Sequence, residues 1–272
     1  MSHLVNPKRM GLIRSGSPVP LLGLTFYPIL MKDYDEFIAC KDAITLRLGT
    51  LPVKYLAMDY FSAIFAFEID TMQATKKAIG LFSKVIRMLQ LSLRIDCDNE
   101  EFSKWISYGK RNDEICIDHI EIHQDEKTVC ITPSDISGQI RGLIADLNGL
   151  ELPDEGENLD LVIANEQKKE FLARGQKRLK HSINDLISSV AYHSRCRESE
   201  VLSWTVREFE ARRSAIDRDK RYMLYGQAEM GGMVTFKNGN PAPSWCYEVY
   251  DDSLGTQSLS ELQFGDAKQK SQ

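Results

Sequence analysis

The sequence predicts a mainly helical α+β protein, with an N-terminal helical bundle and β-hairpin followed by a second, mostly helical domain that ends in an irregular C-terminal strap. Three observations predict this fold class. Apolar residues recur at helical spacing over residues 33–93, they alternate with polar residues over 119–132, and helical spacing returns after a polar stretch near 153–165. The chain has 272 residues, which is enough for two such domains.

Three helices are expected in the bundle. The first spans about 33–48, where Asp33 fits the N-cap position. The second, about 53–68, is apolar on most of its faces, which is typical of a central, buried helix. The third, about 71–93, carries apolar residues on one side at steps of three and four, so we expect it to be half exposed.

A hairpin and a helix are expected after the bundle. Residues 119–123 alternate between polar and apolar, a polar turn follows at 124–127, and residues 128–132 form a second β-type run. A helix then opens at Pro133-Ser134, and Asn148-Gly149 closes it as a left-handed C-cap.

The polar, helix-breaking residues after this helix mark the expected domain boundary. Beyond it, helices are expected at about 160–175 and 176–192, from Ser199 to about 216, and from about 219 to Met230, where Gly231-Gly232 stops the last one. The predicted organisation is an N-terminal arm (1–25), a bundle and hairpin domain (26–152), a linker (153–165), a helical domain with an aromatic strap (166–250) and a disordered tail (251–272).

Composition excludes some classes of protein. The chain carries 34 basic and 39 acidic residues, a net charge of −5, which excludes a surface that is basic throughout for nucleic acid. No apolar run is long enough for a membrane helix. The six cysteines are scattered and form no C-x-x-C pair, so we expect reduced thiols and a cytosolic protein.

No catalytic signature is present, because the sequence holds neither a G-x-S-x-G elbow nor a phosphate-binding or dinucleotide-binding glycine motif. We therefore expect no enzymatic activity, no catalytic residues and no cofactor. The strongest metal candidate is His119-x-Glu121-x-His123, with Cys130 opposite Glu121 if the turn has two residues. Ligands spaced along one strand are an unusual tetrahedral set, so a solvated polar face is expected and no metal.

Two further segments have the character of binding surfaces. A basic cluster over 168–180 could contact phosphates, whereas the basic residues over 207–221 alternate with acidic ones, as in an exposed helix with ion pairs. The Asn-Gly-Asn-Pro-x-Pro run that leads to Trp245 is stiff and aromatic at its tip. Such a segment suits recognition of a partner, or it packs on the helices of its own domain, and the two interpretations are compatible.

Four passages of the sequence resemble tail assembly chaperones, or closely related tail morphogenesis proteins, of long-tailed phages that infect Gram-positive bacteria. Together they span most of residues 25–250. They are Phe26-Tyr27-Pro28-Ile29 with Tyr34-x-x-Phe37 and the helices to Asp70, then Leu147-Asn148-Gly149-Leu150-Glu151-Leu152-Pro153-Asp154, then Leu186-Ile187-x-x-Val190-Ala191 through Trp204-Thr205-x-x-x-Phe209, and last Met233-Val234-x-Phe236-Lys237-x-Gly239-Asn240-Pro241-x-Pro243-Ser244-Trp245.

The resemblance implies a non-enzymatic protein of the host cell cytoplasm that is absent from the mature virion. Such proteins bind the tape measure protein, keep it soluble and recruit tail tube subunits; self-association is left open. Two alternatives stay open: a structural tail or connector component of the virion, and a nucleic-acid-binding adaptor that uses the 168–180 cluster. The residues expected to bind partners are Tyr55, Phe61, Phe65, Phe82, Trp204, Phe209, Phe236, Pro241, Pro243 and Trp245.

Overall fold

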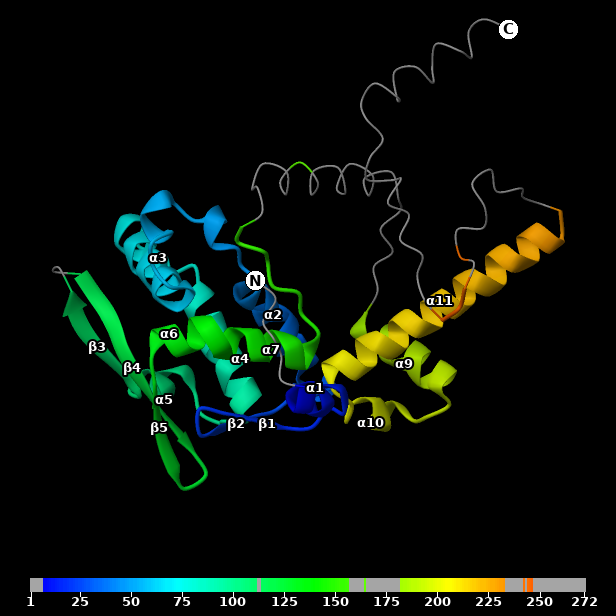
Figure 1. Cartoon of the computed structure of the whole chain (residues 1–272), viewed down its shortest axis with the longest axis horizontal. Coiled ribbons are helices and arrows are strands. Elements are labelled where there is room, and N and C mark those ends of the chain that lie inside the picture. The colour runs from blue at the N-terminus through cyan, green and yellow to red at the C-terminus, as the bar shows by residue number, and fades with distance from the viewer. Residues whose placement is uncertain are drawn as a thin grey trace, which may run out of the picture. The chain divides into compact units, whose positions relative to one another are not determined.

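The computed structural model describes residues 7–111, 114–156, 164, 182–232, 242 and 244–246 (Figure 1). The fold is mainly helical α+β with two small antiparallel sheets, which confirms the predicted fold class. The chain divides into two compact units, Met1–Glu210 and Ala211–Gln272, and the division falls inside the long helix α11 (Val206–Met230).

The expected N-terminal arm contains regular structure. Helix α1 (Pro7–Arg14) precedes a short antiparallel hairpin of β1 (Val19–Leu21) and β2 (Leu24–Phe26). Leu22 and Gly23 both have positive φ, 52° and 81°, which is the backbone of a two-residue type I′ turn. The strands are three residues long, too short for alternation in the sequence to reveal them.

Three helices form the bundle: α2 (Tyr34–Ile44), α3 (Tyr60–Thr75) and α4 (Leu81–Leu93). Helix α2 packs against α4. The prediction of one helix over 71–93 was wrong, because the chain turns between α3 and α4, with Lys76 and Gly80 both at positive φ. Helix α4 buries residues on most of its length, so it is central rather than half exposed.

A three-stranded antiparallel sheet follows, in the order β3 (Ile106–Arg111), β4 (Glu114–Gln124), β5 (Lys127–Ile131), after the short helix α5 (Asn99–Ser103). The β4–β5 pair confirms the predicted hairpin, whereas β3 was not predicted. The inner face of the sheet contacts α3 and α6 through β4 (Figure 1). Four isoleucines are buried on this face: Ile106, Ile120, Ile122 and Ile131.

The predicted helix over 134–147 is confirmed, and it contains a π-helical turn. It runs as α6 (Pro133–Asp135), the π turn η4 (Ile136–Ile140) and α7 (Arg141–Asn148). A capping box between Thr132 and Asp135 opens it, and Gly149 ends it in the left-handed conformation that the sequence predicted, at φ 69°.

Helices α9 (Ile183–Ser194) and α10 (Glu198–Val201) and the first turn of α11 belong to the first unit. The segment before α11 pairs with residues 29–31: the Met31 amide donates to the Trp204 carbonyl and the Val206 amide to the Ile29 carbonyl, both at 2.9 Å. The structure therefore places residues 198–210 with the bundle rather than in the separate domain expected over 166–250. The expected linker lies largely outside the described residues, so that boundary stays a prediction.

Helix α11 is continuous through residues 216–219, where the sequence predicted a break between two helices, and it ends at Met230, just before the two glycines that were expected to stop it. None of the helices in the described part of the chain has the length and apolar character that crossing a bilayer requires.

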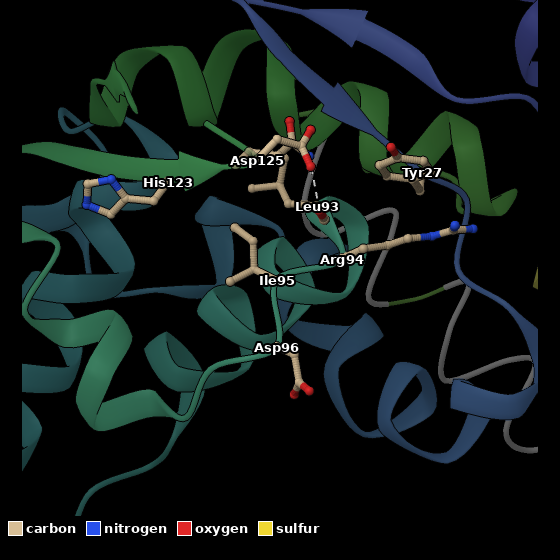
Figure 2. A pocket seen from close by; sticks show the side chains of 8 residues that line it. Tyr27, Leu93, Arg94, Ile95, Asp96, His123 and Asp125 are labelled. Atoms are coloured by element: carbon tan, nitrogen blue, oxygen red, sulfur yellow. Dashed lines mark hydrogen bonds between the residues drawn. The ribbon is translucent and has the colours of Figure 1, made fainter. Parts of the chain in front are cut away.

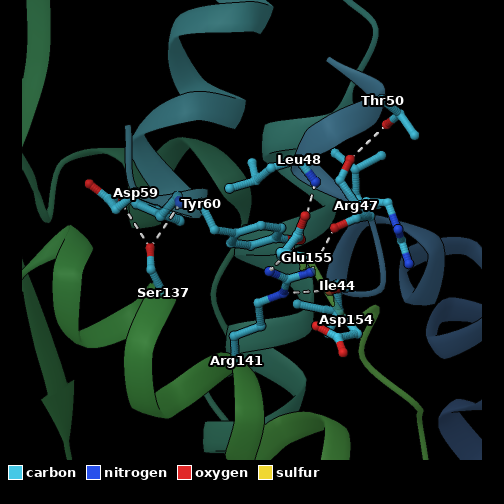
Figure 3. Close-up of polar contacts among 12 residues, drawn as sticks. Ile44, Arg47, Leu48, Thr50, Asp59, Tyr60, Ser137, Arg141, Asp154 and Glu155 are labelled. Carbon is cyan, nitrogen blue, oxygen red and sulfur yellow. Dashed lines mark hydrogen bonds and ion pairs between the residues drawn. The ribbon is translucent and has the colours of Figure 1, made fainter. Parts of the chain in front are cut away.

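A buried arginine connects three segments of the first unit (Figure 3). The Arg141 guanidinium donates to the Ile44 carbonyl at 2.8 Å and the Leu46 carbonyl at 2.6 Å, and it lies 3.7 Å from the centre of the Tyr60 ring. Glu155, 3.9 Å away, accepts from the Leu48 amide. Burial lowers the pKa of Arg141, yet a guanidinium keeps its charge in proteins.

Candidate functional site

A chain of aromatic rings leads from the core to the surface between α3, α4 and β3. The Phe82 ring lies 5.2 Å from both the Phe61 and the Phe65 rings, and the Tyr108 ring lies 5.8 Å from Phe65. Phe61 is fully buried, whereas Tyr108 at the outer end is 51% exposed. Such ring separations are those of favourable aromatic pairs, so the outer rings are held in place by the inner ones.

The apolar face of the sheet continues past the cover that α3 provides. Tyr108 pairs with Ile117, and Lys110 pairs with Ile115, so Tyr108 and Ile115 are diagonal neighbours on one face. Ile117 is buried there, whereas Ile115 is 52% exposed. We call Phe65, Phe82, Tyr108 and Ile115 the apolar patch.

Glu68 holds the backbone under this patch. Its carboxylate, on α3, accepts from the Gly80 amide at 2.8 Å and the Phe82 amide at 2.7 Å. These amides lie at the start of α4, where they have no acceptor within the helix, and the N-cap residue is a glycine that offers no side-chain cap. Glu68 therefore supplies the acceptor that the helix itself lacks. The negative charge also complements the helix dipole.

Burial raises the pKa of Tyr108, so its phenol is neutral across the physiological range.

The structure thus brings Phe61, Phe65 and Phe82, three of the residues expected to bind partners, into one aromatic chain. Tyr108 and Ile115, the two residues of the patch that are most open to solvent, were not predicted from the sequence. The alternation of Ile106 and Tyr108 with polar residues was the available signal, but Gly109, Lys110 and Arg111 end it after two apolar positions.

Three other expected residues of the first unit lie outside this aromatic chain: Tyr55, Trp204 and Phe209. The Trp204 side chain is half-buried. Tyr55 is buried against the edge of Phe67, and its hydroxyl donates to Asp70 at 2.8 Å. Phe209 is fully buried and its ring lies 6.2 Å from Tyr34. These side chains support the fold in this conformation.

The strap is described only in part. Trp245, which belongs to the second unit, is 59% exposed, as an aromatic recognition residue would be. Phe236, Pro241 and Pro243 lie outside the described residues. Their expected role in partner binding stays a prediction.

A pocket of about 390 Å³ lies between the end of α4 and the β4–β5 turn (Figure 2). Arg94 caps α4 in the left-handed conformation, and its guanidinium carbon lies 4.2 Å from the centre of the Tyr27 ring. Asp96 and Asp125 add carboxylates to the same lining. Because both signs of charge line the pocket, it offers no clear preference for an anion or a cation.

The polar groups of this pocket are largely used by the fold. The Gln124 amide nitrogen donates to the Thr25 carbonyl at 2.8 Å and the Leu93 carbonyl at 3.0 Å, which ties the turn to β2 and α4. The His123 ring packs edge-on against Trp105 and shares a hydrogen bond with Thr128. The lining side chains Gln124 and His123 therefore join these segments of the fold.

The residues of the His119-x-Glu121-x-His123 motif have different neighbours in the structure. The turn has two residues, so Cys130 pairs with Glu121 as the sequence suggested. Donor atoms of His119, Glu121 and Cys130 lie within 4.8 Å of one another, whereas His123 is engaged with Thr128. In the described part of the chain, this is the one group of three or more metal-binding side chains that lie close together.

Comparisons of this chain with models of protein families, with curated proteins and with solved structures found no match.

Proposed function

We propose that this protein is a non-enzymatic tail assembly chaperone of a long-tailed phage, which binds the tape measure protein in the host cytoplasm, keeps it soluble and recruits tail tube subunits. The resemblance of the four sequence passages supplies the class of client. The apolar patch supplies a surface for it and is the observation that carries the proposal.

A tape measure protein is long and helical, so its exposed apolar helix faces need cover before assembly. The patch offers Tyr108 and Ile115 to such a face, on a base of packed, tilted aromatic rings that does not need to be ordered on binding. A helix that lays its apolar side onto a preformed apolar surface is a common mode of peptide recognition. Client binding is therefore assigned to the first unit, and tube recruitment to the strap after residue 233.

Co-expression tests the proposal. We expect the tape measure protein to be recovered in the soluble fraction with the wild-type chain and to be lost from it with a Tyr108→Glu, Ile115→Lys double variant, because both changes place charge on the patch. Tyr192→Glu is the matched control: this tyrosine is exposed on α9 and outside the patch, so the same substitution should leave the client soluble.

A tape measure protein that is equally soluble without this chain would contradict the chaperone role. A client that the double variant solubilises as well as the wild type would move the binding surface away from the patch. Truncation after residue 232 should spare client binding and weaken the capture of tail tube protein. Presence of the chain in purified particles at the copy number of a tail component would favour the structural alternative.

A further inference from the structure

The outer face of the three-stranded sheet carries three metal-binding side chains side by side. His119 and Glu121 are two residues apart on β4, and Cys130 on β5 is the register partner of Glu121. All three point away from the inner face, where Ile120 and Ile131 are buried. One donor atom from each lies within 4.8 Å of the others.

The donor set is one that zinc prefers. An imidazole nitrogen, a thiolate sulfur and a carboxylate oxygen are the three usual protein ligands of Zn²⁺, at bond lengths of roughly 2.0–2.3 Å. Tetrahedral geometry at those lengths requires the donors to be about 3–4 Å apart. The side chains of His119 and Glu121 are 31% and 47% exposed and Cys130 is exposed, so rotation of the more open Glu121 and Cys130 side chains can close the remaining gap.

A second observation points to a ligand. His119 Nδ1 lies 3.1 Å from a carboxylate oxygen of Asp118, and its Nε2 lies 3.6 Å from Oε1 of Glu121. A histidine that binds a metal commonly donates its other ring N–H to a carboxylate, which fixes the ring and raises its basicity. With the proton on Nδ1, Nε2 and the Glu121 oxygen face each other as two electron-pair donors, an arrangement that a shared cation stabilises.

The second histidine of the motif does not take part. His123 Nδ1 lies 2.9 Å from the Thr128 hydroxyl, and its ring centre lies 4.8 Å from that of Trp105. These contacts hold the His123 ring beside the pocket described above. The pair of His123 and Thr128 lies two residues further along the hairpin than the pair of Glu121 and Cys130. The set is thus three ligands from two strands, with a fourth position open to solvent.

We propose that His119, Glu121 and Cys130 form a zinc site, with water as the fourth ligand and Asp118 as a positioning residue for the histidine. Ligands spaced along one strand are an unusual tetrahedral set, and the register in the structure supplies Cys130 from the second strand, which was conditional in the sequence, in place of His123. The site would join β4 to β5 on the face opposite the apolar patch. It is independent of the proposed function.

Cobalt titration of the full chain tests this site, because a thiolate ligand gives a sulfur-to-cobalt charge-transfer band and tetrahedral cobalt gives intense visible bands. We expect the metal-free, reduced wild type to bind one Co²⁺ with both signals, and Zn²⁺ to displace it. Cys130→Ser should abolish the charge-transfer band, and His119→Ala should lower the affinity more than loss of the partner of the histidine does. Asp118→Asn should lower it roughly 10-fold and keep the band.

Two variants serve as matched controls. His123→Ala removes the histidine of the same motif, and Cys116→Ser removes another cysteine of β4, so both should bind Co²⁺ as the wild type does. Circular dichroism confirms that each variant is folded. The site is refuted if the wild type shows no charge-transfer band, if Cys130→Ser keeps it, or if the control variants lose it equally.

Discussion

Two polar networks anchor α3, and they differ in their access to water. At its beginning, Arg141 lies buried beneath Tyr60 with a side chain 8% exposed, and it donates to two carbonyl groups (Figure 3). Toward its end, Lys54 and Tyr55 both donate to Asp70, and the Lys54 side chain is 61% exposed. Each network contains a cation, an aromatic ring and a carboxylate.

The difference indicates that burial decides how much such a network contributes to the free energy of unfolding. If Arg141 is removed, the buried Ile44 carbonyl and the partly buried Leu46 carbonyl lose this donor, whereas the exposed Lys54 ammonium can turn to water. An unsatisfied buried polar group is costly, and an exposed ion pair contributes little. The following predictions test this contrast.

The largest effect is expected for Arg141→Met. The substitution keeps apolar bulk under the Tyr60 ring but removes the donors to one buried and one partly buried carbonyl, so the free energy of unfolding should fall by about 2–5 kcal/mol. Urea denaturation followed by circular dichroism measures this loss. An equal change for Arg141→Met and Lys54→Met would contradict the contrast between the two networks.

A smaller loss is expected for Asn148→Ala. The buried Asn148 side chain accepts from the Ile29 amide at 2.9 Å and donates to the Ile144 carbonyl at 2.8 Å, so it joins the end of α7 to the segment before α2. Its removal leaves the Ile29 amide without this partner and should cost about 1–3 kcal/mol in the same measurement. Stability unchanged from the wild type would show that water replaces the side chain.

The capping box of α6 predicts a pH dependence. Hydrogen bonds from the Thr132 hydroxyl and backbone amide lower the pKa of Asp135. A carboxyl group whose pKa is lower in the folded state contributes stability above its unfolded pKa of about 4, and that contribution is lost as the pH falls through the folded value. Asp135→Asn should therefore flatten the fall of stability with acid, and a fall as steep as that of the wild type would contradict this.

The smallest effect on stability is expected for Lys54→Met, for which we expect no measurable change in unfolding. The variant should be visible in a different property. The hydrogen bond from Lys54, and next that from Tyr55, lowers the pKa of Asp70. Without Lys54 this pKa should rise toward its ordinary value in an NMR titration, and an unchanged value would show that Tyr55 alone holds the carboxylate.

The sequence predicted the local features best. The β4–β5 hairpin and the left-handed cap at Gly149 depend on residues close together in the chain. The pairing of Glu121 with Cys130 was expected only if the turn had two residues, and the structure shows that it has. The break between α3 and α4 was missed because the acceptor for the first amides of α4 is Glu68, on the preceding helix. No capping residue next to Gly80 in the sequence indicates that a new helix begins there.

The candidate sites were predictable to different degrees. Phe65 and Phe82 were expected at a partner surface, but Phe65 is buried, as Phe61 and Phe209 are, and the sequence could not separate these three rings from the half-buried Phe82. Tyr108 and Ile115 become a surface only because β3 pairs with β4. The three metal-binding side chains were all identified, whereas the exclusion of His123 depends on Trp105 from another segment.

The residue pattern along the chain specifies most of the helical and strand periods, the cap at Gly149 and the β4–β5 hairpin, since these follow from side chains a few residues apart. The tertiary structure alone decided which aromatic rings are core and which are surface, that residues 198–210 pack on the bundle, and that Arg141 serves carbonyls almost a hundred residues away. The reason is physical: burial and hydrogen-bond partners are properties of the neighbours in space, and periodicity along the chain does not specify them.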